Sequence, residues 1–168
     1  MENSNITTQE TQKPVEYAGF WWRFLAYIID EIILSFIEFI IILPVLGIFG
    51  LSIFGLVESG YNKEEMLMFL GPMFGILFLI IIISIAINWL YFAIMESSKT
   101  QGTLGKMLLK IKVTDYNGER ISFAKATCRY FGKIISGMIL MIGYIMAGFT
   151  DRKQALHDMM ASCYVIKE

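Results

Sequence analysis

The stretch that decides the fold is residues 20–57, which read FWWRFLAYIIDEIILSFIEFIIILPVLGIFGLSIFGLV. A helix rises about 1.5 Å per residue, so about 20 apolar residues cross the hydrocarbon core of a bilayer. This run is longer than one crossing needs, and Pro44 disfavours helical geometry at Leu43. The pattern predicts a membrane span over about 20–43, followed by a kinked, glycine-rich continuation to a loop at 58–65.

The composition of the whole chain is that of a small integral membrane protein. Of its 168 residues, 56% are hydrophobic and 17% are charged, and the mean hydropathy is +0.60. Soluble domains carry about 25% charged residues and about 45–50% apolar residues even with glycine counted. The net charge of −1 does not support nucleic-acid binding, so we expect no nucleic-acid partner.

A second apolar run, residues 67–95, predicts a second full span. The loop at 58–65 between the spans holds one lysine and three glutamates, whereas the segment 96–133 holds eight cationic residues. Cytoplasmic loops carry the excess of lysine and arginine. We therefore expect a multi-pass protein of the cell inner membrane, with the polar tail 1–17 and the segment 96–133 both cytoplasmic.

The third apolar segment, residues 134–149, is short for a crossing and is interrupted by glycines. It either forms a simple third span or is re-entrant, with a helix over about 123–140 that breaks at Gly143 and returns. The re-entrant alternative is favoured because it leaves the C-terminal segment 150–168, with its cations, on the cytoplasmic side.

Three short β-prone runs predict a small cytoplasmic sheet. Asn117-Gly118 marks a turn, so residues 110–114 and 120–122 are expected to pair as an antiparallel hairpin. Residues 163–166 would add a third strand, because two strands alone are marginal. The fold class is therefore an α-helical integral membrane protein with two full transmembrane helices, a third, short or re-entrant apolar helical segment and a small cytoplasmic β-hairpin or sheet.

Two charged residues of the first span share one helix face. Arg23 and Asp30 are seven residues apart, which places them within about 20° on the face and about 10.5 Å apart along the axis. That is too far for a direct pair in a straight helix, and Asp30 lies about one-third of the way across the expected span. An ionisable residue there normally faces protein or water and marks a site. The alternative is a structural role in helix packing.

Further polar residues of the two spans could contribute to a site with Arg23 and Asp30. Glu31 and Glu38 are also seven residues apart and share a second face of the first span. Ser84 and Asn88, spaced by four on the second span, could bond across the helix interface or act as ordinary helix–helix contacts.

Motifs for catalysis, metals and cofactors are not expected in this chain. Residues 102–106 lack the spacing and the Ser or Thr of a phosphate-binding loop. His157 is the only histidine, and there is no Gly-x-Ser-x-Gly nucleophile elbow. We therefore expect no enzyme activity, no catalytic residue, no metal and no cofactor.

Three motifs resemble those of the RDD family of bacterial membrane proteins. They are YAGFWWRFLAYIID at 17–30, ESSKTQGTLGK at 96–106 and QALHD at 154–158. The resemblance covers roughly 17–168, and it makes 18–168 one membrane domain. Where family members often have a glycine, this chain has Ser162.

The resemblance implies functional positions, because the family is named for one arginine and two aspartates. Those positions are Arg23, Asp30 and most simply Asp158, with Asp151 as the rival. A charge cluster of Arg23, Asp30 and Asp158 near the cytoplasmic end is the expected arrangement. The possible accessory residues are Glu31, Glu38, Asn88, Asp151 and His157.

A transport role is suspected for the family, and cation/proton antiport has been attributed to some members. The resemblance therefore implies an oligomeric transporter or a cation/proton exchanger that uses the intramembrane Arg/Asp cluster. The alternative is a non-transporting accessory or scaffold protein whose cytoplasmic sheet docks a partner. The expected partners are membrane lipid and either further copies of the chain or another membrane protein.

Overall fold

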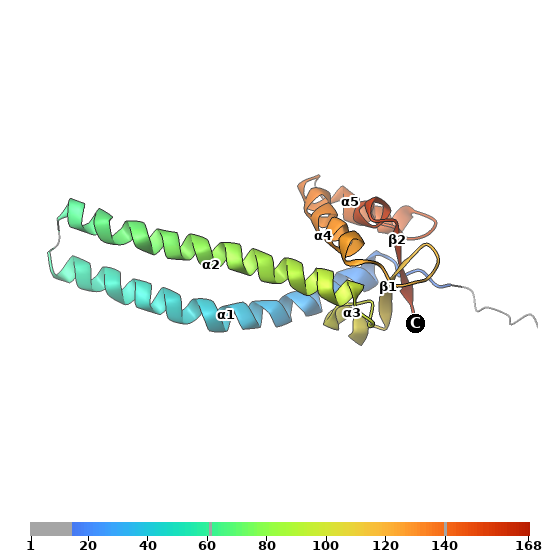
Figure 1. The fold of residues 1–168 in the computed structure, drawn as a ribbon, viewed down its shortest axis with the longest axis horizontal. Helices are drawn as coiled ribbons and strands as arrows, with labels where there is room; N and C mark the ends of the chain where they lie inside the picture. Colours follow the sequence, from blue (N-terminus) through green and yellow to red (C-terminus); the bar gives the residue numbers. More distant parts are fainter. Residues whose placement is uncertain (1–14, 61, 140) are drawn as a thin grey trace, which may run out of the picture.

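A computed structural model describes residues 15–60, 62–139 and 141–168. Two long helices lie side by side as an antiparallel hairpin, and all the other elements gather where the first helix begins and the second ends (Figure 1). We call this region the folded end and the opposite end the hairpin tip. The elements in chain order are α1 (Phe20–Glu58), α2 (Lys63–Ser97), α3 (Leu104–Leu108), β1 (Ile111–Asp115), α4 (Phe123–Met138), α5 (Ile142–Phe149), α6 (Leu156–Met160) and β2 (Cys163–Lys167).

The two long helices are apolar and long enough to cross a membrane, as the sequence predicts. Their bounds differ from the expected ones. Helix α1 continues through Pro44 to Glu58, so it is longer than the span expected over 20–43. Helix α2 begins inside the loop expected at 58–65, because Asn62 caps it: the Asn62 side chain accepts bonds from the N–H groups of Glu64 and Glu65.

Apart from Glu58 at its last position, the charged residues of α1 lie in the half nearest the folded end. With 39 residues, α1 is about 58 Å long, nearly twice the roughly 30 Å hydrocarbon core. Residues 39–57 hold no charged side chain, and their helical length of about 28 Å matches that core. The stretch from Arg23 to Glu38 therefore lies beside the folded end.

The sheet is two-stranded and antiparallel, and it joins segments far apart in sequence. β1 pairs with β2 from Ile111 opposite Lys167 to Asp115 opposite Cys163. The other edge of β2 meets the segment just before α1, where Tyr17 bridges Ile166. The expected strand at 163–166 is thus present. Its position beside Tyr17 brings the end of the chain back to the start of α1.

The expected hairpin between 110–114 and 120–122 is wrong. The turn after β1 closes on Asp115, whose N–H bonds the Glu119 carbonyl at 2.8 Å and whose carboxylate accepts two further backbone N–H groups. Ser122 then caps α4 by accepting from the N–H of Lys125. Too few residues remain between the turn and the cap to form a strand, so β2 takes the place beside β1.

The third apolar segment is bent, by 102° between α4 and α5. Helix α4 ends at Met138, before the expected break at Gly143, which lies inside α5. A Cβ on Gly143 would stand 2.6 Å from the Ser136 Oγ. The glycine therefore lets α5 fold back closely against α4. Together with the position of β2, this bend matches the re-entrant alternative.

Candidate functional site

Arg23 and Asp158 form an ion pair at the folded end. The Arg23 Nη1 donates to the Asp158 Oδ2, and the Nε donates to the Ala18 carbonyl at 2.8 Å. The Nη2 donates to the Lys153 carbonyl at 2.5 Å. One guanidinium thus ties the first turn of α1 to Asp158 inside α6 and to Lys153 in the segment before α6, which makes Arg23 an anchor between the long helices and the C-terminal part.

The pair continues into a buried network. The Nε of Arg129 lies 3.0 Å from the Asp158 Oδ1, and its Nη1 lies 3.3 Å from a Glu96 carboxylate oxygen. The other oxygen of Glu96 meets the ammonium groups of Lys106 and, at 3.4 Å, Lys133. We call these six residues the ion-pair network: Arg23, Glu96, Lys106, Arg129, Lys133 and Asp158.

The network holds four cationic side chains and two carboxylates. Burial raises the pKa of the Asp158 carboxyl, but Arg23 and Arg129 outweigh it and hold that pKa well below its usual range. Burial lowers the pKa of Lys106 to about 7, although Glu96 acts in the opposite direction. The Asp158 carboxyl is therefore ionised, whereas Lys106 gives up its proton more easily than an ordinary lysine.

Asp30 belongs to a different set of contacts. Its buried carboxylate accepts hydrogen bonds from the Tyr91 hydroxyl at 2.9 Å, the Thr103 hydroxyl at 2.5 Å and the Gly105 N–H at 2.7 Å. These donors come from the end of α2 and the start of α3. The expected single cluster is therefore divided: Asp30 holds α3 against α1, while Arg23 and Asp158 meet elsewhere.

Gly105 allows this close contact between α3 and α1. A Cβ at this position would lie 2.2 Å from the Ala26 carbonyl oxygen and 3.0 Å from the Asp30 Cγ. Those atoms leave no room for a side chain, and the backbone oxygen cannot rotate away. Gly105, within the motif at 96–106, is thus required for the contact that Asp30 completes.

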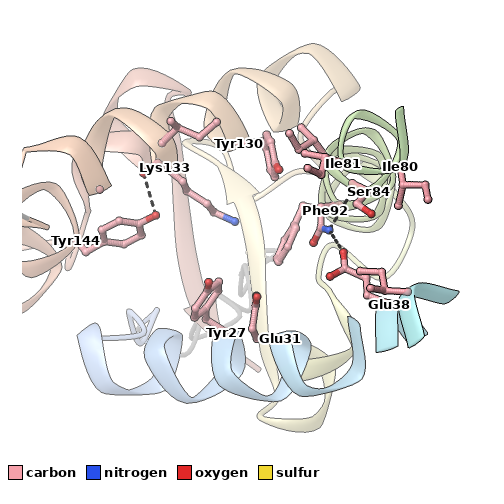
Figure 2. A pocket seen from close by; sticks show the side chains of 15 residues that line it. Tyr27, Glu31, Glu38, Ile80, Ile81, Ser84, Phe92, Tyr130, Lys133 and Tyr144 are labelled. Atoms are coloured by element: carbon pink, nitrogen blue, oxygen red, sulfur yellow. Dashed lines mark hydrogen bonds between the residues drawn. The ribbon is translucent and has the colours of Figure 1, made fainter. Parts of the chain in front are cut away.

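A cavity of about 620 Å³ opens between α1, α2, α4 and α5 (Figure 2). Glu31 and Glu38 both line it, as their shared helix face predicts. The Asn88 Nδ2 donates to Glu38 at 2.8 Å across the interface of α1 and α2. Lys133 points into the cavity from α4, with its Nζ 4.3 Å from the centre of the Phe92 ring. The ionisable side chains of this cavity are accessible: Glu31 is exposed, and Glu38 and Lys133 are half-buried.

The other two expected accessory residues differ in burial. Asp151 is exposed, and it is Asp158 that pairs with Arg23. His157 is buried, and its Nε2 lies 3.5 Å from an Asp158 oxygen. Burial lowers the pKa of His157 to about 3, so the imidazole is neutral at physiological pH. Within the described ranges, no group of three or more His, Cys, Asp or Glu side chains could hold a metal ion.

Sequence reasoning missed several members of these sites. From the sequence, Arg129 and Lys133 were considered only as part of the positive charge of the segment 96–133. Their spacing by four residues nevertheless places both on one face of α4. Glu96 and Lys106 stand at the two ends of the second motif. The sequence signal for this pair was the acidic Glu96 at the end of an apolar span, followed ten residues later by the cationic Lys106.

Comparisons with known proteins agree with this arrangement. The sequence model of the RDD family matches residues 17–162. The uncharacterized protein YxaI of Bacillus subtilis is 41% identical over 150 residues, covering 89% of this chain and 96% of its own length. The uncharacterized membrane protein YteJ of the same organism is 28% identical over 158 residues, covering 90% of this chain and 82% of its own. No solved structure matches significantly.

Proposed function

We propose an ion-coupled transport function for this chain, which belongs to the RDD family of membrane proteins. The proposal assigns the exchange of protons and cations to Glu31 and Glu38. It gives Arg23, Asp30 and Asp158 an architectural role. The excess of lysine and arginine at the folded end supports a cytoplasmic location for that end and for the N-terminus.

The observation that carries the proposal is the pair of accessible carboxylates in the cavity. A group that exchanges a proton for a cation must be reachable and must be able to lose its partner. Asp30 accepts three hydrogen bonds and is 1% exposed, and Asp158 is 0% exposed. Glu31 is exposed and Glu38 is half-buried, with Asn88 as a neutral partner. Only the two glutamates meet both requirements among these acids.

An oligomer would complete the pathway. Only 6% of the most apolar window of α1 and none of that of α2 is buried. Two helices with this much free surface cannot enclose a route through a bilayer by themselves. Several copies packed through these faces could, and the faces are apolar enough to meet lipid or one another.

The scaffold alternative receives less support from the sheet. The outer edge of β1 already bonds Gln101, with the Val113 N–H donating to the Gln101 carbonyl at 2.7 Å. The outer edge of β2 bonds the segment before α1, where the Ala18 N–H donates to the Val165 carbonyl at 2.8 Å. A partner could not add a strand at these positions without displacing the chain's own contacts.

Cation-dependent proton flux in vesicles reconstituted with the full chain tests the proposal. Glu31→Gln and Glu38→Gln should each lower flux at least tenfold with unchanged thermal stability, because the amide keeps the shape but cannot carry a proton. Glu58→Gln at the hairpin tip is the matched control and should leave flux unchanged. Wild-type vesicles without flux for Na⁺, K⁺ or Li⁺, or full flux in the Glu31 and Glu38 variants, would overturn the proposal.

A further inference from the structure

The lining of the cavity changes from polar to apolar along the long helices. On α1 the lining is polar from Tyr27 through Glu31 to Glu38 and becomes apolar one helical turn later at Ile42. On the antiparallel α2, in the same direction, the lining begins with Phe92, continues through the polar Asn88 and Ser84, with Ile85 between them, and ends with Ile81 and Ile80. Residues 27 and 42 on α1 are about 22 Å apart along the helix axis. Such a gradient fits a molecule with a polar head at the folded end and an apolar tail toward the membrane centre.

The polar end of the cavity presents opposite charges on facing walls. Glu31 points into it from α1, and Lys133 points into it from α4 (Figure 2). The two side chains form no ion pair with each other in the described part of the chain. Lys133 shares the Glu96 carboxylate with Lys106 and Arg129, so its charge is only partly balanced. Each wall can therefore bind an opposite charge on a ligand.

Aromatic rings stand beside the acidic wall. Tyr27 precedes Glu31 by one helical turn, and Tyr130 faces the same space from α4 (Figure 2). A ring face attracts an ammonium group when it lies within about 6 Å of it. Carboxylate and rings together suit a primary ammonium, while the ammonium of Lys133 suits a phosphate.

We propose that this cavity binds a membrane phospholipid whose headgroup carries both a phosphate and a primary ammonium. Lys133 binds the phosphate, and Glu31 binds the ammonium with Tyr27 and Tyr130 beside it. The acyl chains lie along the isoleucines of α1 and α2. The inference shares the cavity of the proposed function, so the headgroup ammonium competes with a cation for Glu31, but binding itself requires no transport.

The chemistry predicts an order of preference among phospholipids. A phosphatidylethanolamine offers a phosphate to Lys133 on one wall of the cavity and a primary ammonium to Glu31 on the other. A phosphatidylcholine keeps both charges, but its quaternary ammonium cannot donate a hydrogen bond to Glu31. A phosphatidylglycerol lacks the ammonium and brings only negative charge to a cavity that also holds Glu38. We expect binding to weaken in this order, by about tenfold between the first lipid and the last.

Native mass spectrometry of the full chain in detergent, titrated with each of the three lipids, measures this order. Glu31→Gln should remove the preference for phosphatidylethanolamine over phosphatidylglycerol. Lys133→Gln should weaken the binding of all three lipids, whereas Lys133→Arg should bind them as the wild type does. The comparison distinguishes loss of the phosphate contact from disturbance of the ion-pair network. Glu58→Gln and Lys99→Gln, both exposed and outside the cavity, are the matched controls.

Three results would overturn the lipid assignment. They are equal binding of phosphatidylethanolamine and phosphatidylglycerol by the wild type, an unchanged preference in Glu31→Gln, or binding of soluble phosphoethanolamine as tight as that of the lipid. The last result would identify a soluble zwitterion as the occupant. Ion flux without lipid preference would refute this inference alone, whereas lipid preference without ion flux would refute the transport proposal alone.

Discussion

Arg23 and Asp158 form an ion pair although 135 residues separate them in the chain. Arg23 is 11% exposed, whereas Asp158 is completely buried and also faces Arg129 at 3.0 Å. The pair is therefore asymmetric: Asp158 has a second cationic partner, while the further partners of Arg23 among the described residues are the backbone carbonyls of Ala18 and Lys153. This asymmetry determines what each substitution should do.

Removal of Asp158 should destabilise the protein more than removal of Arg23. Asp158→Asn removes the carboxylate that Arg23 and the buried Arg129 share and leaves Arg129 with Glu96 as its remaining carboxylate, which costs about 3–5 kcal/mol. Arg23→Ala leaves Asp158 with Arg129, so we expect roughly half that loss. Thermal unfolding of the purified protein in one detergent gives both values.

The double variant tests the asymmetry directly. Adding Arg23→Ala to Asp158→Asn removes one of the two cations, Arg23 and Arg129, that have lost the Asp158 carboxylate. The double variant should therefore be less stable than wild type but no less stable than Asp158→Asn alone. Strictly additive losses would show that the ion pair contributes nothing through its charges.

A methyl group at Gly105 should be among the most damaging small substitutions in the chain. Its Cβ would lie 2.2 Å from the Ala26 carbonyl oxygen, and pushing α3 away from α1 should cost about 3 kcal/mol or more. Gly75→Ala in α2 is the matched control, because its Cβ would meet no atom within 4 Å. Equal melting temperatures for the Gly105→Ala and Gly75→Ala proteins would contradict the described contact between α3 and α1.

Ser162 should be a site of easy stabilisation. It lies between α6 and β2 with φ at +52°, a left-handed conformation that costs a residue with a Cβ about 1 kcal/mol. Ser162→Gly should therefore raise the melting temperature by a few degrees. An unchanged or lower melting temperature would mean that the Ser162 side chain contributes contacts worth more than the strain.

The sequence predicts those features that depend on local pattern. Apolar length alone indicates α1 and α2, and the spacing of Glu31 and Glu38 correctly places them on one face. The pairing of β1 with β2 was only partly predictable, because the Asn117-Gly118 turn signals a local hairpin while the actual partner lies about fifty residues later. Likewise, Asp30 could not be separated from Arg23 by spacing, since its partners come from α3, a segment with no strong pattern.

The stability of the protein should fall as the pH drops from 6.5 to 5.0, and His157 should be the main cause. Burial lowers the pKa of His157 to about 3 in the folded protein, whereas a histidine in an unfolded chain titrates near 6.5. The unfolded state thus takes up the proton first, so stability is complete above about pH 6.5 and decreases toward pH 3. The loss should reach about 2 kcal/mol at pH 5.0, since each pH unit corresponds to about 1.4 kcal/mol.

His157→Gln separates this histidine from the acids of the network. The Asp158 carboxyl has a pKa below its usual range, so its contribution is lost only below about pH 4, the ordinary value for an aspartate. The variant should therefore start from a lower stability at pH 6.5, because the packing against Tyr144 and Gly132 changes, but its melting temperature should stay nearly constant down to pH 5.0. A His157→Gln protein with the same slope as the wild type over this window would assign the acid sensitivity to another group.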